Sequence, residues 1–403
     1  MKIGIDARFW DESGVGRYIR NLVSHLEKID KKNSYVLFTS KKNHIELKNS
    51  NCATTKWQVP LGWKMVPTDI HWHSIEEQIK FPQIINREGL DLMHFPYFSV
   101  PIFYHKPFVV TIHDLILHHF ATGEATTRSQ LVYKLKLMGY KFVMKNSAQN
   151  AKKIIAVSRA TKQEIIDHLN VPKEKIDVIY EGADQKITLN SLPAKDRTMS
   201  RARIVQKGEW QDLVGQLSTF NFKNYLLHIG NLYPHKNMNM VLSALKKIKD
   251  EERIPIQLII AGKEDYFYQR FQKKAKELGL ENQILFLGEV SDSKLHELYQ
   301  NALALISPSL MEGFDLPTIE AMNSNCLVLS SDIPVHKEIC KDISIYFDPK
   351  NAEDLTSKLK QVYKNKKEMY KEKIKNGESR ASQFNWEQMA RETLKVYESC
   401  TGL

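Results

Sequence analysis

The sequence is poor in cysteine and has no long apolar run. Its four cysteines, Cys52, Cys326, Cys340 and Cys400, lie far apart without a C-x-x-C pair, which argues against a disulfide framework or a zinc site and fits a reducing compartment. No uninterrupted apolar segment approaches the roughly 18 residues that span a bilayer, and the N-terminus has no signal-peptide pattern. We therefore expect a cytoplasmic protein.

Acidic residues are fewer than basic ones. The 403 residues include 58 Lys and Arg but only 47 Asp and Glu, which gives a formal net charge of +11. This excess favours an anionic partner, such as a nucleic acid, a phosphorylated ligand or a membrane surface. Because helix-turn-helix, zinc-finger and aromatic-basic RNA-binding signatures are all lacking, we do not expect nucleic acid. The content of 42% hydrophobic residues is that of a globular chain with two or three domains.

Short apolar runs typical of strands alternate with amphipathic segments typical of helices. The strand-like runs are Lys2–Asp6, Tyr35–Thr39, Leu90–Phe95, Phe108–Ile112, Lys153–Val157, Ile176–Tyr180, Tyr225–Ile229, Ile256–Ala261, Ile284–Leu287, Ala304–Ile306, Cys326–Ser330 and Ser344–Phe347. Strands separated by helices of about ten or more residues predict parallel sheets covered on both faces. The fold class is therefore α/β, with two doubly wound, Rossmann-like domains that face a central cleft.

A polar stretch interrupts this alternation and divides the chain. It is rich in Lys, Arg, Ser and Thr, and we interpret it as a linker. The predicted boundaries are residues 1–182 for an N-terminal domain, 183–222 for the linker and 223–383 for a C-terminal domain. Residues 384–403 are predicted to form a closing helix that packs back on the N-terminal domain.

Three segments that follow predicted strands contain residues suited to an anionic ligand. Gly14-Val15-Gly16 opens a helix, and it is either a phosphate-binding turn or only a tight turn. His113 follows a strongly apolar strand, where a His-Asp pair is more often a packed ring and a helix cap than a site. Lys236 lies in a glycine-containing loop, either as the cation of a phosphate cradle or as a solvated lysine.

The most informative segment is Glu312-Gly313-Phe314-Asp315-Leu316-Pro317-Thr318-Ile319-Glu320. Pro317 suits the first turn of a helix, so one carboxylate precedes the helix and the other lies one turn inside it. The segment resembles the E-x7-E signature of the retaining glycosyltransferases of family 4, which have the GT-B fold. Further blocks resemble that family in order: Met1–Arg20, Thr111–Leu115, Ala156–Glu181, Leu226–Asn237 and Leu285–Ser330.

The resemblance implies a role for each matching residue. The C-terminal domain would hold a nucleotide-sugar and the N-terminal domain an acceptor. The catalytic residues would be Glu312 at the donor sugar, Lys236 at the diphosphate and His113 at the sugar from the other domain. The implied donor-binding set, with Glu320 on the ribose and Val290 meeting the base through its backbone, is Gly14, Gly16, His235, Val290, Gly313, Phe314, Asp315, Leu316 and Glu320.

Two positions depart from the family pattern. His235 stands where an arginine is common, so full neutralisation of the diphosphate needs Arg17 or a protonated His235. Asp315 stands where glycine is common, and its carboxylate would disfavour a diphosphate unless it points at sugar hydroxyls or outward.

The implied reaction is retaining hexosyl transfer in cell-surface polysaccharide synthesis. The pattern resembles bacterial mannosyltransferases and favours GDP-mannose, with a UDP-sugar donor or a non-catalytic nucleotide-sugar-binding scaffold as alternatives. Because the sequence contains no D-x-D motif, we expect no metal and no other cofactor. The pair His71 and His73 is better explained by surface or packing roles than as metal ligands.

A basic stretch lies between Ala125 and Gln163, where Asp and Glu do not occur. Within it, Leu131, Leu135, Met138 and Phe142 recur at helical spacing. Such a helix either packs its apolar stripe on the domain core or lies on an anionic membrane. We favour membrane contact on the inner face of the cell membrane, through the basic residues Arg128, Lys134, Lys141 and Lys145.

Overall fold

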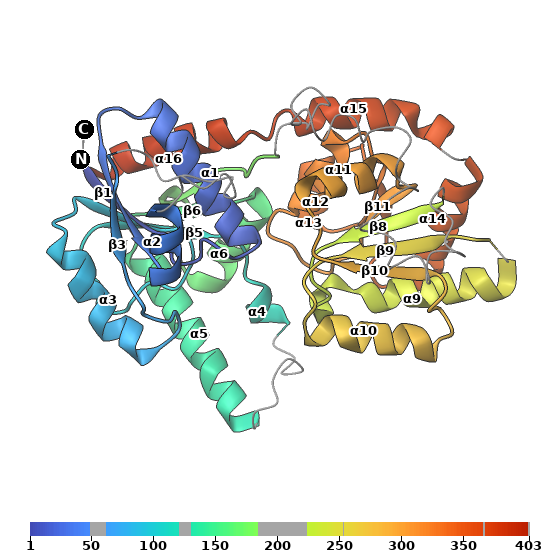
Figure 1. Ribbon diagram of the computed structural model, residues 1–403, viewed down its shortest axis with the longest axis horizontal. Coiled ribbons are helices and arrows are strands. Elements are labelled where there is room, and N and C mark those ends of the chain that lie inside the picture. Colours follow the sequence, from blue (N-terminus) through green and yellow to red (C-terminus); the bar gives the residue numbers. More distant parts are fainter. Residues whose placement is uncertain (49–61, 121–129, 184–223, 253, 366, 402–403) are drawn as a thin grey trace. The chain divides into compact units, whose positions relative to one another are not determined.

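The computed structural model describes residues 1–48, 62–120, 130–183, 224–252, 254–365 and 367–401 (Figure 1). The chain divides into two compact units, Met1–Gly182 with Phe384–Leu403, and Ala183–Gln383. The linker predicted over residues 183–222 lies, except for its first residue, outside the described part. Among the described helices, none is long and apolar enough to cross a membrane.

The N-terminal unit is built on a seven-stranded parallel sheet. Its strands, in the spatial order β3-β2-β1-β4-β5-β6-β7, are β1 (Lys2–Asp6), β2 (Ser34–Thr39), β3 (Lys64–Pro67), β4 (Leu92–Phe95), β5 (Phe108–Ile112), β6 (Lys153–Ala156) and β7 (Ile176–Val178). β4 and β5 are buried at every position, as expected for strands covered on both faces.

The helices of this unit come from both ends of the chain. They are α1 (Gly14–Ile29), α2 (Lys41–Lys48), α3 (Ile75–Arg87), α4 (Ile116–His119), α5 (Gln130–Asn150), α6 (Arg159–Leu169) and, last in the chain, α16 (Trp386–Thr401). α16 packs against α1, which buries Ile19, Leu22 and Leu26 on one face. The closing helix therefore belongs to the N-terminal unit.

The C-terminal unit has a six-stranded parallel sheet in the order β10-β9-β8-β11-β12-β13. Its strands are β8 (Tyr225–Ile229), β9 (Gln257–Ala261), β10 (Ile284–Gly288), β11 (Ala304–Ser307), β12 (Val328–Ser331) and β13 (Ile345–Phe347). Its helices are α9 (Met238–Lys247), α10 (Tyr266–Glu277), α11 (Asp292–Asn301), α12 (Leu316–Asn323), α13 (Pro334–Cys340), α14 (Ala352–Asn365) and α15 (Lys371–Ala381). The predicted α/β class with two doubly wound parallel sheets is thus confirmed.

Local sequence signals account for most of the element boundaries. The Ser158 side chain caps α6 by accepting a hydrogen bond from the Thr161 N–H, and Asp265 caps α10 in the same way. β3 was not predicted, because this half-exposed edge strand has no continuous apolar run. The helix α9 gives way to a π-helical turn at Ile248–Glu252.

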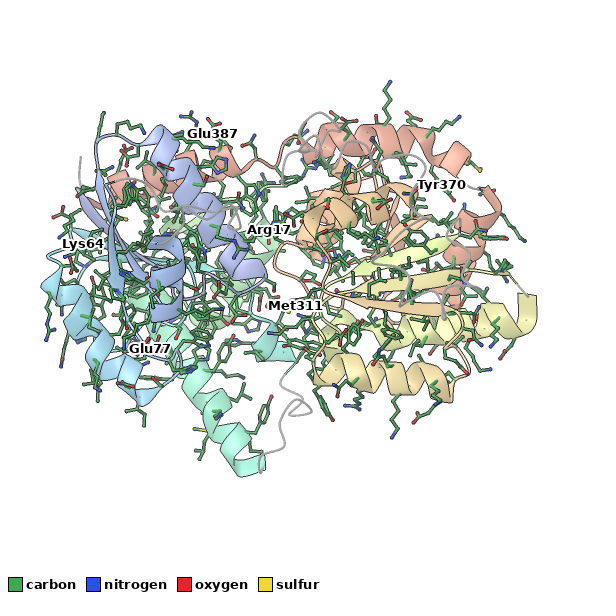
Figure 2. The ribbon with its side chains drawn as sticks, in the orientation of Figure 1. Arg17, Lys64, Glu77, Met311, Tyr370 and Glu387 are labelled. Carbon is green, nitrogen blue, oxygen red and sulfur yellow. The ribbon has the colours of Figure 1, made fainter. Side chains whose placement is uncertain are left out.

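A buried charge network joins β1 to α3 in the N-terminal unit. The Arg8 guanidinium donates to Asp6 Oδ2 at 2.7 Å and to Glu77 Oε1 at 2.6 Å, and it lies 3.8 Å above the Phe81 ring. Glu77, which is labelled in Figure 2, also accepts from the His73 N–H at 2.7 Å. Burial raises the pKa of Glu77 despite this pairing. Each buried charge therefore has an opposite partner, as burial in a low dielectric requires.

Candidate functional site

The C-terminal sheet reverses its strand order between β8 and β11, and the segments that follow these strands are in contact. Lys236 closes a 3₁₀ turn after β8, and Glu312 lies between β11 and α12. Lys236 Nζ is 2.5 Å from Glu312 Oε1, which also accepts from Ser309 Oγ at 2.6 Å. The structure thus places a half-buried ion pair at the switch point, where parallel α/β sheets bind ligands.

His235 links the same two loops through its backbone rather than its charge. Its carbonyl accepts a hydrogen bond from the Leu310 N–H at 2.8 Å. Burial, together with the neighbouring Lys236, lowers the pKa of His235 to about 4. The imidazole is therefore neutral at pH 7 in the free chain.

Asp315 points into the C-terminal unit and not outward, which was one of the two directions considered from the sequence. Its Oδ2 accepts from Ser307 Oγ at 2.7 Å and from His336 Nε2 at 3.0 Å, inside the unit. Burial alone would raise the pKa of Asp315, but His336 and the nearby charge of Lys236 lower it. Its backbone is left-handed, with φ of 68°, which explains why glycine suits this position. The carboxylate is thus anchored inside the unit by Ser307 and His336.

Glu320 lies one turn inside α12 and is buried. Its Oε2 accepts a hydrogen bond from the Tyr299 hydroxyl of α11 at 2.9 Å. Upstream, Phe314 is buried, with 4% of the residue exposed. The short helix α12 begins at Leu316, directly after Gly313, Phe314 and Asp315. The structure therefore holds the Glu320 carboxylate in one orientation through a tyrosine.

Glycines mark the carboxyl ends of three neighbouring strands. A Cβ on Gly262 would lie 2.1 Å from the Gly230 carbonyl oxygen, so no larger residue fits there. The Gly262 N–H donates to the carbonyl of Gly288, whose own N–H donates to the Tyr268 hydroxyl. Val290, half-buried, lies two residues beyond Gly288. These close backbone approaches shape the edge of the sheet that bears Lys236.

In the N-terminal unit, His113 follows β5 and both its ring nitrogens are engaged. Nδ1 is 2.9 Å from Glu181 Oε1, and Nε2 is 3.0 Å from the Pro96 carbonyl. Burial by itself lowers the pKa of His113, but the hydrogen bond and charge of Glu181 outweigh it and the net shift is upward. The ring also meets Tyr18 edge-on at 5.1 Å. His113 is therefore an oriented, readily protonated imidazole.

The two glycines at the start of α1 have different surroundings. A Cβ on Gly16 would lie 2.5 Å from the Trp10 carbonyl oxygen, so this glycine is required by the tight turn. Around Gly14, the first residue of the helix, there is open space. The tight-turn interpretation of Gly16 thus has a direct structural reason, while Gly14 leaves the helix N-terminus accessible.

Comparison with known proteins agrees with this geometry. The family description "Glycosyltransferase Family 4" matches residues 13–186, and "Glycosyl transferases group 1" matches residues 214–380. The chain belongs to glycosyltransferase family 4. This glycosyltransferase is 29% identical over 313 residues to the O-antigen chain mannosyltransferase RfbU of Salmonella typhimurium, covering 78% of the chain and 74% of the relative.

A second relative and a solved structure point the same way. Identity to the O-antigen chain mannosyltransferase B of Escherichia coli is 26%, over 76% of the chain and 74% of the relative. The fold matches HepE of Anabaena, solved in complex with UDP and glucose, with a TM-score of 0.69 at 17% identity, over 99% of this chain and 100% of that one. The likeness confirms the predicted GT-B fold.

Several polar residues around the site were not singled out from the sequence. They are Glu181 beside His113, Tyr299 beside Glu320, Ser309 beside Glu312, and Ser307 and His336 beside Asp315. Glu181 ends a block that resembles the family, which is a signal that sequence reasoning had available. Tyr299 and His336 lie on other helices and carry no local signal, because only folding brings them to their partners.

Proposed function

We propose that this glycosyltransferase transfers a mannosyl group from GDP-mannose to a glycan or lipid-linked acceptor during cell-surface polysaccharide assembly, with retention and without a metal. The observation that carries the proposal is the Lys236–Glu312 pair at the switch point, with Glu320 held eight residues farther along in α12. The mannosyl specificity is supported by the two O-antigen mannosyltransferases among the relatives. The acceptor would bind to the N-terminal unit.

In this proposal, catalysis consists of stabilising a leaving diphosphate. The bond from the anomeric carbon to the phosphate oxygen breaks while the acceptor hydroxyl oxygen bonds to the same face of the sugar. The acceptor proton moves to the departing phosphate oxygen. Lys236 meets the growing charge, and backbone N–H groups near Phe314 and at Gly14 add to it. Glu312, engaged by Lys236 and Ser309, orients the sugar and is not a nucleophile.

His113 would assist from the N-terminal unit as a charged imidazole. Glu181 and the Pro96 carbonyl hold the ring, so a protonated His113 keeps one orientation. A fixed positive charge needs no reorganisation when the diphosphate leaves, and this is the basis of electrostatic catalysis. Glu181 is a positioning residue in this scheme.

A donor panel tests the proposal. The purified chain is incubated with GDP-mannose, UDP-glucose and other GDP- and UDP-sugars, and nucleotide release is measured with and without an acceptor extract. We expect turnover with GDP-mannose, no loss of activity in EDTA, and a product whose anomeric NMR coupling shows retention.

Each alternative has its own outcome in the same panel. Turnover with UDP-sugars alone would favour the UDP-dependent reading, for which HepE in complex with UDP and glucose is the structural precedent. Binding without turnover of any donor would indicate a scaffold. Activity lost in EDTA and restored by Mg²⁺, or a product with inverted configuration, would contradict the mechanism.

Glu320 is expected to bind the ribose of the donor. Replacement of Glu320 by Ala removes a charged hydrogen-bond acceptor, so nucleotide binding should weaken by about 1.5–3 kcal/mol. Isothermal titration with GDP measures the effect. The control is Glu277→Ala, a glutamate on α10 whose side chain is 61% exposed. Equal GDP affinity in the Glu320 variant and the parent would contradict the assignment of Glu320 to the ribose.

We also propose that α5 contacts an anionic membrane. Three of the four residues of the apolar stripe, Leu135, Met138 and Phe142, are 58%, 67% and 61% exposed, which favours membrane contact over packing on the core. The burial of the fourth, Leu131, lies outside what the structure describes. Lys134, Lys141 and Lys145 are exposed on the same helix, while Arg128 lies outside the described residues. The helix extends beyond the other elements of its unit (Figure 1). Exposed apolar and basic residues on one helix suit a lipid surface.

Replacing Lys134, Lys141 and Lys145 by Gln should weaken binding to anionic liposomes, because each basic residue near such a surface contributes about 1 kcal/mol. Co-sedimentation at several salt concentrations measures the change, and the remaining binding should depend less on salt. The matched control replaces Lys273, Lys274 and Lys276, three exposed lysines of α10. Failure of the parent chain to bind anionic liposomes at low salt would contradict the proposal.

A further inference from the structure

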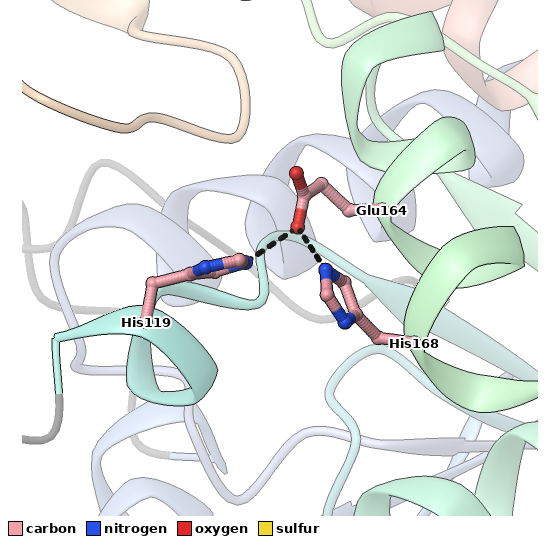
Figure 3. A group of neighbouring side chains, drawn as sticks. All are labelled: His119, Glu164 and His168. Carbon is pink, nitrogen blue, oxygen red and sulfur yellow. Dashed lines mark hydrogen bonds and ion pairs between the residues drawn. The ribbon is translucent and has the colours of Figure 1, made fainter.

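A cluster of two histidines and a glutamate lies in the N-terminal unit. His119 is the last residue of α4, and Glu164 and His168 lie one turn apart on α6. Glu164 Oε2 is 2.7 Å from His119 Nε2 and 3.3 Å from His168 Nε2 (Figure 3). Two imidazoles from different helices thus converge on one carboxylate oxygen.

We propose that His119, Glu164 and His168 bind a divalent transition-metal ion, with zinc as the best match. One ligand atom from each residue lies within 4.8 Å of the other two. Around a tetrahedral zinc with bonds of about 2.0–2.1 Å, neighbouring ligand atoms are roughly 3.3 Å apart. Small rotations of these side chains reach that spacing. Two imidazole nitrogens and one carboxylate oxygen form a borderline donor set, which suits zinc better than magnesium or calcium.

The fold holds two of the three proposed ligands, Glu164 and His168, in place and leaves the cluster open to solvent. Ser158 caps α6, and Thr161, Ile165 and Leu169 bury its inner face, so Glu164 and His168 are held on a rigid helix. The three ligand side chains are between 31% and 39% exposed, which leaves an entry path and room for water as a fourth ligand. The neighbouring His118 has its Nδ1 at 3.2 Å from the Tyr140 hydroxyl and is not counted among the ligands.

The bound ion would tie the end of α4 to α6 within the N-terminal unit. This site is separate from Lys236 and Glu312, which lie in the C-terminal unit, so it is compatible with glycosyl transfer that needs no metal. The inference does not rest on the proposed function. The bound ion would have a structural role, because a metal that bridges two elements of the folded chain stabilises the folded state relative to the unfolded state.

The test uses the untagged full chain, stripped of metal and dialysed against a range of Zn²⁺ concentrations. The bound zinc is counted by elemental analysis, and Co²⁺ replaces it to report the ligand geometry through its visible absorption. We expect one zinc per chain at this site. Loss of an outer-shell partner typically lowers metal affinity roughly 10–100-fold. We expect the zinc affinity to fall by at least this factor in each of the variants His119→Ala, His168→Ala and Glu164→Gln.

The control is His71→Ala, which removes an exposed histidine of the pair noted in the sequence and should bind zinc as the parent does. Without zinc, unfolding midpoints of all variants should stay close to the parent's, because the replaced side chains are partly exposed. With zinc, only the parent and the control should gain thermal stability. Equal zinc binding by parent and cluster variants, or its loss in His71→Ala, would overturn the proposal and leave a hydrogen-bonded His-Glu-His group.

Discussion

Lys236→Ala should lower kcat by about 10²–10³-fold, the cost of removing one preorganised donor from a site where charge develops. The sugar nucleotide should bind with much less change, since the diphosphate gains most of its charge only as it leaves. In the free protein Lys236 is paired with Glu312 at 2.5 Å, so the cation is already in place before the donor arrives. Single-turnover kinetics at saturating GDP-mannose, compared with the Kd, separates the two effects.

A lysine without this environment provides the control. Lys273 on α10 is 80% exposed and 3.9 Å from Glu277, and its replacement by Ala should leave both constants unchanged. Lys236→Ala also leaves the half-buried Glu312 without its cation. Comparing Lys236→Ala/Glu312→Gln with Glu312→Gln alone checks whether the loss comes from an unpaired carboxylate. Normal turnover of Lys236→Ala at saturating donor would refute the role in catalysis.

Arg8→Met should destabilise the N-terminal unit by about 3–5 kcal/mol, the range for breaking a buried ion pair by removing one partner. The guanidinium is the shared partner of Asp6 and Glu77, and its loss leaves two buried carboxylates facing each other. Urea unfolding followed by fluorescence measures the change. The transition of the N-terminal unit is fitted separately, because a two-unit chain is not a two-state system.

The matched control is the exposed pair Arg391–Glu387 of α16, in the same unit. Its NH2–Oε1 distance is 2.6 Å, equal to that of Arg8–Glu77, but its side chains are 53% and 51% exposed instead of 2% and 0%. Figure 2 labels Glu77 and Glu387 in these two settings. Arg391→Met should cost only about 0.2–1 kcal/mol. Similar losses of unfolding free energy in both variants would show that burial does not determine how much this ion pair contributes to stability.

The strand pattern could be predicted because parallel strands buried on both faces leave continuous apolar runs. Tyr225–Ile229 and Phe108–Ile112 were predicted with the boundaries observed. β3 was missed because an edge strand needs only one buried face and Lys64–Pro67 has no such run.

In the candidate site, too, some residues could be predicted from the sequence and others could not. Glu312, Glu320 and Lys236 were found from local spacing and resemblance, because the turns that hold them follow predictable strands. The direction of Asp315 was not found, because it depends on His336, 21 residues farther along and on another helix. The lowered pKa of His235 could not be predicted, because its cause, burial, has no signature in a loop sequence.

The sequence by itself determined the parallel α/β architecture, the family and the residues that end the strands, since apolar periodicity and motif spacing act over a few neighbouring positions. Only the tertiary structure decided which of those residues meet. Lys236 and Glu312 are 76 positions apart, His113 and Glu181 are 68 apart, and His119 and Glu164 are 45 apart. Strand order brings such segments together, because crossover connections place the carboxyl ends of distant parallel strands on one edge of the sheet.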